Sequence, residues 1–368
     1  APEDLDEPIP LVIVQGFLGG GTTWLWGNFE HYLNLGTKSP KPRRTIIVSV
    51  GPVSSLHDRA CELYYALRGG TGEPSRMDYG TEHSETHNHS RYGRKIPQGQ
   101  YPHWSPEKPL HFLGHSIGGP TIIKLQSLIK QGHFDPGAQT RMILSINAVS
   151  SPFRGTPAVY LLGERADAAP AVRPLSFGSM VGKGVHILSF ISPLLPGRWT
   201  CMATALWKSD WAESRDATPF DVTFQAADER EANGEGNLDP NTFYQSHVAC
   251  MVNGSCPLLE LGRFEYSILR PPPSFLHPSM GEEHWANDGV VPIFSQWHPL
   301  SCRVSVQLED DDNKLTLELE PGVWYVNEEE NATHLSLIPL WTGTERQRRF
   351  WMRLGKWLTT VEGKRKDC

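Results

Sequence analysis

The chain has 368 residues, of which 39% are hydrophobic, so it is long and apolar enough to bury a sizeable core. Its formal net charge is −7 and its 34 lysine and arginine residues are scattered, which argues against a nucleic-acid-binding protein. No apolar run reaches the length of a membrane span and no internal repeat is visible, so we expect one domain over residues 1–368.

The first predicted strand covers residues 9–14, a continuous apolar run typical of a strand buried on both faces. It is followed by Gly16, Phe17 and a glycine cluster at 19–21, where the backbone can approach a ligand closely. A phosphate-binding loop is a poor interpretation of this segment, because the required glycine spacing and the Walker lysine are missing.

Further strand-like runs follow at 44–50, 110–113, 142–148 and 244–252. They alternate with helical or looping segments, and this rhythm is typical of βαβ units. We therefore predict an α/β fold with a mostly parallel central sheet flanked by helices.

Residues 114–118 read Gly-His-Ser-Ile-Gly, a G-x-S-x-G pattern directly after the run at 110–113. Residues 119–130 continue with an apolar period of 3.6 residues, and Gly132 stands where a helix C-cap is expected. This strand–turn–helix context predicts a nucleophile elbow, a sharp bend that exposes the hydroxyl of Ser116 above the sheet.

An elbow serine needs a base and an orienting acid, which α/β-hydrolases supply later in the chain in the order Ser, Asp, His. Asp288 lies in a turn beside an apolar pair, and His334 lies at a loop end just ahead of an apolar segment. We predict that Asp288 is the acid and His334 the base. The alternatives are that Asp288 only forms an Asx turn with Gly289, and that His334 is a hydrogen-bonded core residue.

The other late acids and histidines fit the triad less well. The acidic run at 310–312 stands between alternating segments at 303–308 and 314–320, which predicts a solvated hairpin tip. Three histidines lie amid prolines or charges, and none is placed as the last triad member on a strand-end loop: His277, His284 and His298.

Two backbone N–H groups are expected to bind the oxyanion that forms during acyl transfer. One belongs to the residue after the nucleophile and the other to the loop after the first central strand, which here are Ile117 and Phe17. Together with the triad they predict ester hydrolysis through an acyl-enzyme.

Several spaced motifs extend this pattern along the chain. The most specific ones lie at 50–62, 69–71, 78–80 and 83–93, and further matches lie at 151–156, 209–211, 240–244, 287–289 and 322–324. With them, most of the chain resembles the thermoalkaliphilic bacterial and staphylococcal true lipases, which are zinc-containing α/β-hydrolases that act on triacylglycerols. The resemblance implies a triacylglycerol lipase whose substrate is a lipid ester at an oil–water interface, and no protein partner is indicated.

The resemblance also implies one structural zinc ion, bound largely by an insertion at 52–100. The ligands carried over by motif are Asp58, His83, His89 and Asp210; His87 stands close to His89, and Asp216 and Asp221 are alternatives to Asp210. Zinc accepts imidazole nitrogen and carboxylate oxygen in closed sites, although from the residues alone a solvated polar loop is an equal interpretation. The calcium site of the family is not expected here, because Ser336 and Trp341-Thr342 stand where its ligands would be.

The segment at 157–200 combines many apolar side chains with glycines and prolines. We interpret it as a lid that covers an apolar substrate groove in water and opens at a lipid surface. An ordinary core helix with loops is the alternative.

We expect a secreted protein, because the chain starts at Ala1 as a processed mature protein would. Glycosylation sequons stand at Asn88, Asn253 and Asn331. Cysteine pairing is left open: Cys250–Cys256 and Cys302–Cys368 are possible pairs, and Cys61 and Cys201 are either free or bridged. Alternative functions are a carboxylesterase, acyltransferase or polyester hydrolase with the same triad, and an inactive lipid-binding protein of the same fold.

Overall fold

The structure is a computed structural model of the chain. It describes residues 7–17, 26–35, 37, 39–51, 54–69, 98–162, 215, 218–251, 286–299, 302, 305–308, 319–338 and 341–367. Within these residues, no helix is both long and apolar enough to cross a bilayer.

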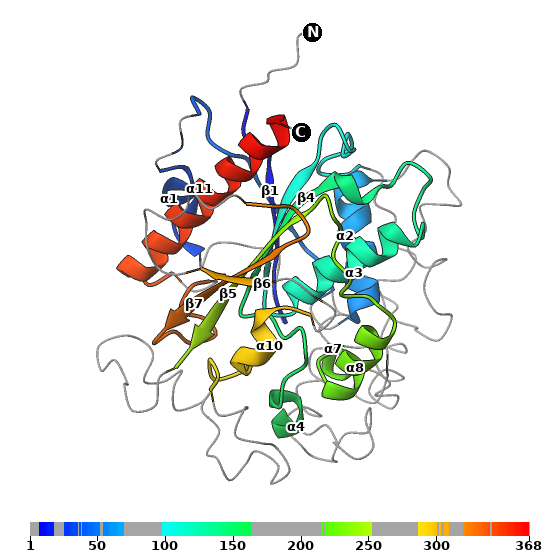
Figure 1. Cartoon of the computed structure of the whole chain (residues 1–368), viewed down its shortest axis with the longest axis vertical. Coiled ribbons are helices and arrows are strands. Elements are labelled where there is room, and N and C mark those ends of the chain that lie inside the picture. The colour runs from blue at the N-terminus through cyan, green and yellow to red at the C-terminus, as the bar shows by residue number, and fades with distance from the viewer. Residues whose placement is uncertain are drawn as a thin grey trace, which may run out of the picture.

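A parallel sheet forms the centre of the molecule (Figure 1). In the described residues its strands are β1 (Leu11–Val14), β2 (Thr45–Val48), β3 (Leu110–His115), β4 (Ile143–Val149), β5 (Phe243–Cys250), β6 (Ser305–Leu308) and β7 (Trp324–Glu330). Their order is β2-β1-β3-β4-β5-β7-β6, and every neighbouring pair is parallel. The predicted α/β class with a mostly parallel sheet is confirmed.

Helices cover both faces of the sheet. The described helices are α1 (Phe29–Asn34), α2 (Leu56–Arg68), α3 (Gly118–Lys130), α4 (Ala158–Leu162), α7 (Thr218–Asp221), α8 (Phe224–Ala232), α10 (Ile293–Trp297) and α11 (Glu345–Asp367), with a 3₁₀ turn at Thr140–Met142. In Figure 1, α1 and α11 lie on one side of the sheet and α2 and α3 on the other.

The alternation of side chains along β1 shows why this strand reads as an unbroken apolar run. Leu11 and Ile13 belong to the cluster formed with α1 and α11, whereas Val12 and Val14 belong to the cluster formed with α2 and α3. All four side chains are fully buried. Because both faces are covered by helices, no position on β1 is left for a polar residue.

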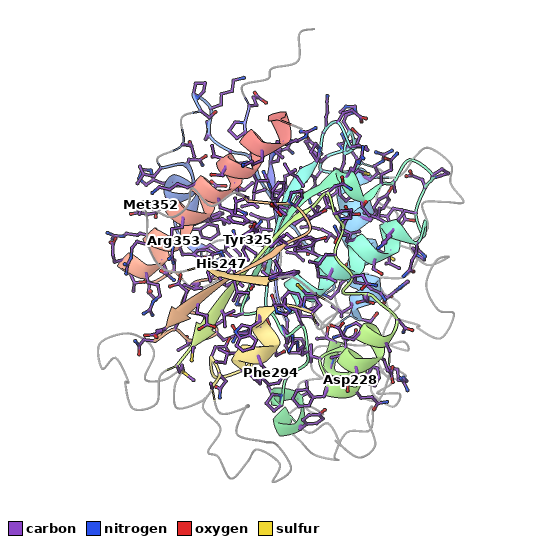
Figure 2. All side chains as sticks on the ribbon, viewed as in Figure 1. Asp228, His247, Phe294, Tyr325, Met352 and Arg353 are labelled. Carbon is purple, nitrogen blue, oxygen red and sulfur yellow. The ribbon has the colours of Figure 1, made fainter. Side chains whose placement is uncertain are left out.

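The helix α11 packs on the strands at the C-terminal half of the chain (Figure 2). The ring of His247 on β5 meets Phe350 edge-on at 4.9 Å, and Tyr325 on β7 meets Trp357 at 5.4 Å. Burial lowers the pKa of His247 to about 3, so this imidazole is neutral and acts as a core residue.

Near its C-terminal end, α11 is tied to the sheet by Glu362. One of its carboxylate oxygens accepts hydrogen bonds from the Ile9 N–H (2.9 Å), from the Arg43 guanidinium (2.5 Å) and from His111 Nε2 (3.2 Å). Burial alone would raise the pKa of this carboxyl, but the bond from His111 and the charge of Arg43 outweigh it and hold the pKa at about 2.

Glu362→Gln is therefore expected to destabilise the fold by about 3 kcal/mol at neutral pH. The pKa of Glu362 is depressed in the folded state, so its contribution is present above 4.5 and is lost as the pH falls from 4.5 toward 2. Denaturant unfolding of both proteins at pH 7 and pH 3 measures this difference. Glu345→Gln, an exposed change on the same helix, should cost less than about 1 kcal/mol at either pH, and an equal loss in both variants would contradict the assignment.

Candidate active site

The G-x-S-x-G segment forms a tight turn between β3 and α3. Ser116 has φ 53° and is half-buried, and its N–H donates to the Val149 carbonyl at 2.9 Å. A Cβ at Gly114 would lie 2.4 Å from the Gly119 nitrogen, and one at Gly118 would lie 2.2 Å from the Val14 oxygen. Only glycine fits at these two positions, and the turn has the geometry of a nucleophile elbow.

Asp288 and His334 come together although 46 positions separate them in the sequence. His334 follows β7, and Asp288 lies on the chain between β5 and α10. The Nδ1–H of His334 donates to Asp288 Oδ2 at 2.8 Å, and the exposed fractions are 7% for His334 and 0% for Asp288. This arrangement fixes the tautomer of His334 and leaves Nε2 as a proton acceptor.

The other carboxylate oxygen of Asp288 is also occupied. Oδ1 accepts the N–H groups of Val290 at 2.9 Å and Val291 at 2.7 Å. Asp288 thus organises its own turn, as the alternative interpretation expected, and contacts the imidazole of His334 as well. The Gly289 N–H bonds instead to Asn287 Oδ1 at 2.8 Å.

His115 connects the elbow to the His334 loop. Its Nε2–H donates to the backbone carbonyl of His334 at 2.9 Å, and the two rings lie 5.0 Å apart between centroids. Burial lowers the pKa of His115 to about 3, so it is a neutral donor and a positioning residue. Among the described residues, the Ser116 hydroxyl makes no hydrogen bond with His334; such bonds often tighten only with substrate.

The two predicted oxyanion donors lie beside the nucleophile. A Cβ at Gly16 would stand 2.8 Å from Ser116 Cβ, so the loop after β1 touches the elbow. Phe17 and Ile117 pack in one apolar cluster, together with Leu56, Val159, Val222 and Tyr160. Within the described part of the chain, neither the Phe17 N–H nor the Ile117 N–H donates a hydrogen bond, so both can bind a ligand oxygen.

Arg59 holds the loop after β1 in place through a hydrogen bond to its backbone. This contact was not predicted from the sequence. Its fully buried guanidinium donates to the Gln15 carbonyl (2.5 Å), the Gly51 carbonyl (2.7 Å) and Thr121 Oγ1 (3.0 Å). These bonds join the ends of β1 and β2 to α3. The sequence signal that could have revealed this contact is an arginine at helical spacing from apolar residues of the same helix.

Of the three histidines that fit the triad less well, the structure describes one, His298, and its ring bonds elsewhere than to Asp288. His298 lies at the end of α10 and contacts Arg154 at 3.5 Å and the Pro299 carbonyl at 2.8 Å. His277, His284 and residues 310–312 lie outside the described residues.

Of the four predicted zinc ligands, the structure describes Asp58 alone. It lies in the first turn of α2 and is 1% exposed. Asp221, an alternative ligand, accepts the Leu56 N–H at 2.7 Å, and burial raises its pKa to about 7. The remaining candidates lie outside the described residues: His83, His87, His89, Asp210 and Asp216.

A different group of side chains with metal-ligand donor atoms is present in the described residues. The donor atoms of His57, Cys61 and His133 all lie within 4.8 Å of one another. This group was not predicted from the sequence, although the spacing of His57 and Cys61 by four positions puts them on one helix face and could have indicated two of its three members. His133 comes from a distant loop.

Comparison with known proteins finds similarity to lipases. A family model described as "Lipase-like, C-terminal domain" matches residues 10–187. A lipase of Staphylococcus hyicus is 28% identical over 88% of this chain and 52% of its own length, and one of Staphylococcus epidermidis is 26% identical over 86% and 48%. The chain therefore spans about half the length of the curated relatives that it matches.

Solved structures agree with these matches. The crystal structure of Staphylococcus hyicus lipase has a TM-score of 0.72 and 25% identity, and the match covers 99% of this chain and 98% of that one. EstA from Clostridium botulinum matches with a TM-score of 0.64 and 24% identity over 96% of this chain and 87% of that one, a likeness of fold alone.

Proposed function

We propose that this chain is a lipase of the staphylococcal type, a triacylglycerol lipase that cleaves carboxylic esters through an acyl-enzyme. The observation that carries the proposal is the 2.8 Å bond between His334 and Asp288, tethered by His115 to the turn that bears Ser116. An aspartate and a histidine joined beside an elbow serine are the parts of a serine hydrolase triad.

The chemistry follows from these parts. His334 Nε2 takes the proton of Ser116 as Oγ attacks the ester carbonyl carbon, and the N–H groups of Phe17 and Ile117 stabilise the resulting oxyanion. His334 then gives the proton to the departing glycerol oxygen, which leaves the acyl group on Ser116. Water, deprotonated by His334, attacks this ester, and the fatty acid leaves as Ser116 recovers its proton.

The apolar cluster beside the nucleophile supports a lipid acyl group as substrate. Phe17 and Ile117 meet Val159 and Tyr160, which lie on α4 at the start of the predicted lid at 157–200. The rest of that segment, from 163 on, lies outside the described residues, so its role as an interfacial cover is part of the proposal. Emulsified long-chain triacylglycerol should be hydrolysed faster than soluble short-chain esters, and the reverse preference would favour a carboxylesterase.

Labelling with an alkylphosphonate separates the enzyme from an inactive lipid-binding protein. Only an activated serine reacts with such a reagent, because the phosphorus must be attacked by a deprotonated hydroxyl. Mass spectrometry is expected to find one adduct, on Ser116. An unlabelled protein that still binds triacylglycerol would overturn the proposal.

We also propose that Asp58, His83, His89 and Asp210 hold a structural zinc ion. The set of two carboxylates and two imidazoles suits zinc, and four protein ligands leave no position for a reacting water. The ion would brace the insertion, while the serine machinery performs the hydrolysis.

Asp58→Asn is expected to lower the zinc content by one ion per chain and to lower Tm more than the initial rate at moderate temperature. Loss of a structural metal removes folding free energy without touching the reacting groups. Metal analysis and thermal denaturation measure both effects. Asp228→Asn on the exposed face of α8, labelled in Figure 2, serves as the control, and an immediate, reversible loss of turnover on chelation would indicate a catalytic metal instead.

We further propose that the enzyme acts outside the cell, where an oil–water interface is accessible to it. Activity should be found in the culture medium of its source. Activity confined to the cells would contradict this.

A further inference from the structure

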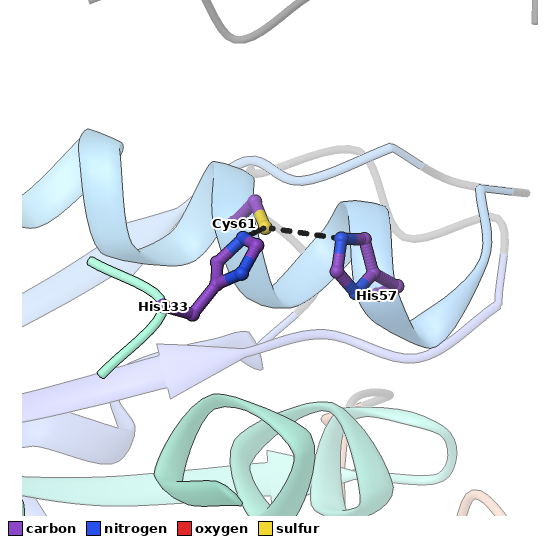
Figure 3. A group of neighbouring side chains, drawn as sticks. All are labelled: His57, Cys61 and His133. Carbon is purple, nitrogen blue, oxygen red and sulfur yellow. Dashed lines mark hydrogen bonds between the residues drawn. The ribbon is translucent and has the colours of Figure 1, made fainter. Parts of the chain in front are cut away.

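Three side chains with soft or borderline donor atoms meet where α2 passes the end of α3 (Figure 3). His57 and Cys61 stand one helical turn apart on α2, and His133 follows α3 after Gly132. Cys61 Sγ lies 3.8 Å from His57 Nε2 and 3.8 Å from His133 Nε2. Both imidazoles thus present the same nitrogen to one sulfur.

These distances are close to those of a metal-bound set. Zinc bonds of about 2.0–2.1 Å to nitrogen and about 2.3 Å to sulfur place the two donors about 3.6 Å apart in a tetrahedral site. The observed 3.8 Å requires only a small approach of each imidazole. The two rings lie 5.3 Å apart at 80° to each other, so they can converge on one point without a clash.

We propose that His57, Cys61 and His133 bind a Zn²⁺ ion at a second site, which shares no ligand with the zinc site proposed on Asp58. A thiolate and two imidazoles form a donor set that zinc accepts. As the metal–sulfur bond forms, the thiol proton leaves to solvent. Cys61 is fully buried, whereas the two histidines are half-buried and give the ion a path from solvent.

The bound ion would act as a structural clamp. It would join the first half of α2 to the loop after α3, and α3 begins at the elbow that carries Ser116. The triad residues lie on other segments, namely the turn between β3 and α3, the chain before α10 and the loop after β7. Ion binding is therefore expected to raise Tm without entering the reaction, and the proposal does not depend on the chemistry of the triad.

Cobalt(II) substitution of the full chain tests the site, because a thiolate bound to Co²⁺ gives a charge-transfer absorption in the near ultraviolet. The proposed Asp58 site contains no sulfur, so the band does not report on that site. Two equivalents of Co²⁺, one for each proposed site, should fully develop the band in the unaltered chain. Cys61→Ser should abolish it and lower the metal content by one ion, whereas Asp58→Asn should lower the content and keep the band.

Matched variants keep the test decisive if the buried Cys61 position does not tolerate serine. His57→Gln changes a half-buried helix position and His133→Gln a half-buried loop position, so both proteins should fold. Each should weaken Co²⁺ binding by more than about tenfold, since even outer-shell changes cost roughly 10–100-fold. Cys250→Ser, at a half-buried thiol on β5, should leave the band unchanged.

Two results would overturn the proposal. One is the absence of a thiolate band in the unaltered chain after metal removal and cobalt loading. The other is a band that survives in both histidine variants with unchanged affinity, since it would then arise from a different cysteine.

Discussion

Ser116→Ala is expected to lower kcat for ester hydrolysis by about 10⁵–10⁶-fold, because the variant lacks the oxygen that forms the acyl-enzyme. The fold should remain intact. Alanine keeps the Cβ that packs against Gly16 and removes only the half-exposed hydroxyl. The hydrolysis of a chromogenic ester, followed over time, gives the rate, and thermal denaturation checks the fold.

Ser150 provides a matched control for this variant. It follows the neighbouring strand β4 and also has a positive φ, 51° against 53° for Ser116. Its side chain is 1% exposed and makes no hydrogen bond within the described residues, so no substrate can reach it. Ser150→Ala should retain turnover. Activity that survives in Ser116→Ala but disappears in Ser150→Ala would require a different nucleophile.

Much of the fold could be predicted from the sequence because β1, β3, β4 and β5 are buried on both faces and β2 is buried on one. Their apolar runs lie within two residues of the observed bounds, as for 142–148 against Ile143–Val149. The strand β7 was missed because only Trp324 to Val326 are buried, and the remainder is polar, with three glutamates of which Glu328 and Glu330 are exposed. The helix α11 was not predicted either, although it covers one face of the sheet.

The triad residues of the candidate site could be predicted, because local sequence pattern and chain order identify them. The G-x-S-x-G turn determines Ser116, and the order Ser, Asp, His leaves Asp288 and His334 as the pair that meets in space. The contacts of His115 and Arg59 depend on backbone carbonyls from other strands, which no local pattern reveals. The same holds for the convergence of His133 with Cys61 across 72 positions of sequence.

Asp288→Asn is expected to lower kcat by about 10⁴-fold, although it changes only an oxygen into an amide nitrogen. The N–H groups of Val290 and Val291 both need an acceptor at Oδ1, so the asparagine must place its oxygen there. Its NH₂ group then faces His334 Nδ1 and can only donate to it. The imidazole would take the tautomer with its proton on Nε2, and this nitrogen could no longer accept the proton of Ser116.

Asp239→Asn is the matched control for that argument. Asp239 is also buried and uses Oδ1 to accept the N–H of a residue two positions on, Asn241, at 2.8 Å, but it lies before β5. This variant should keep kcat within about twofold, since changes away from the reacting groups leave transition-state binding intact. Phosphonate labelling should slow in Asp288→Asn as much as turnover does, because both need an activated Ser116. A variant that labels at the normal rate would mean that Asp288 only organises its turn.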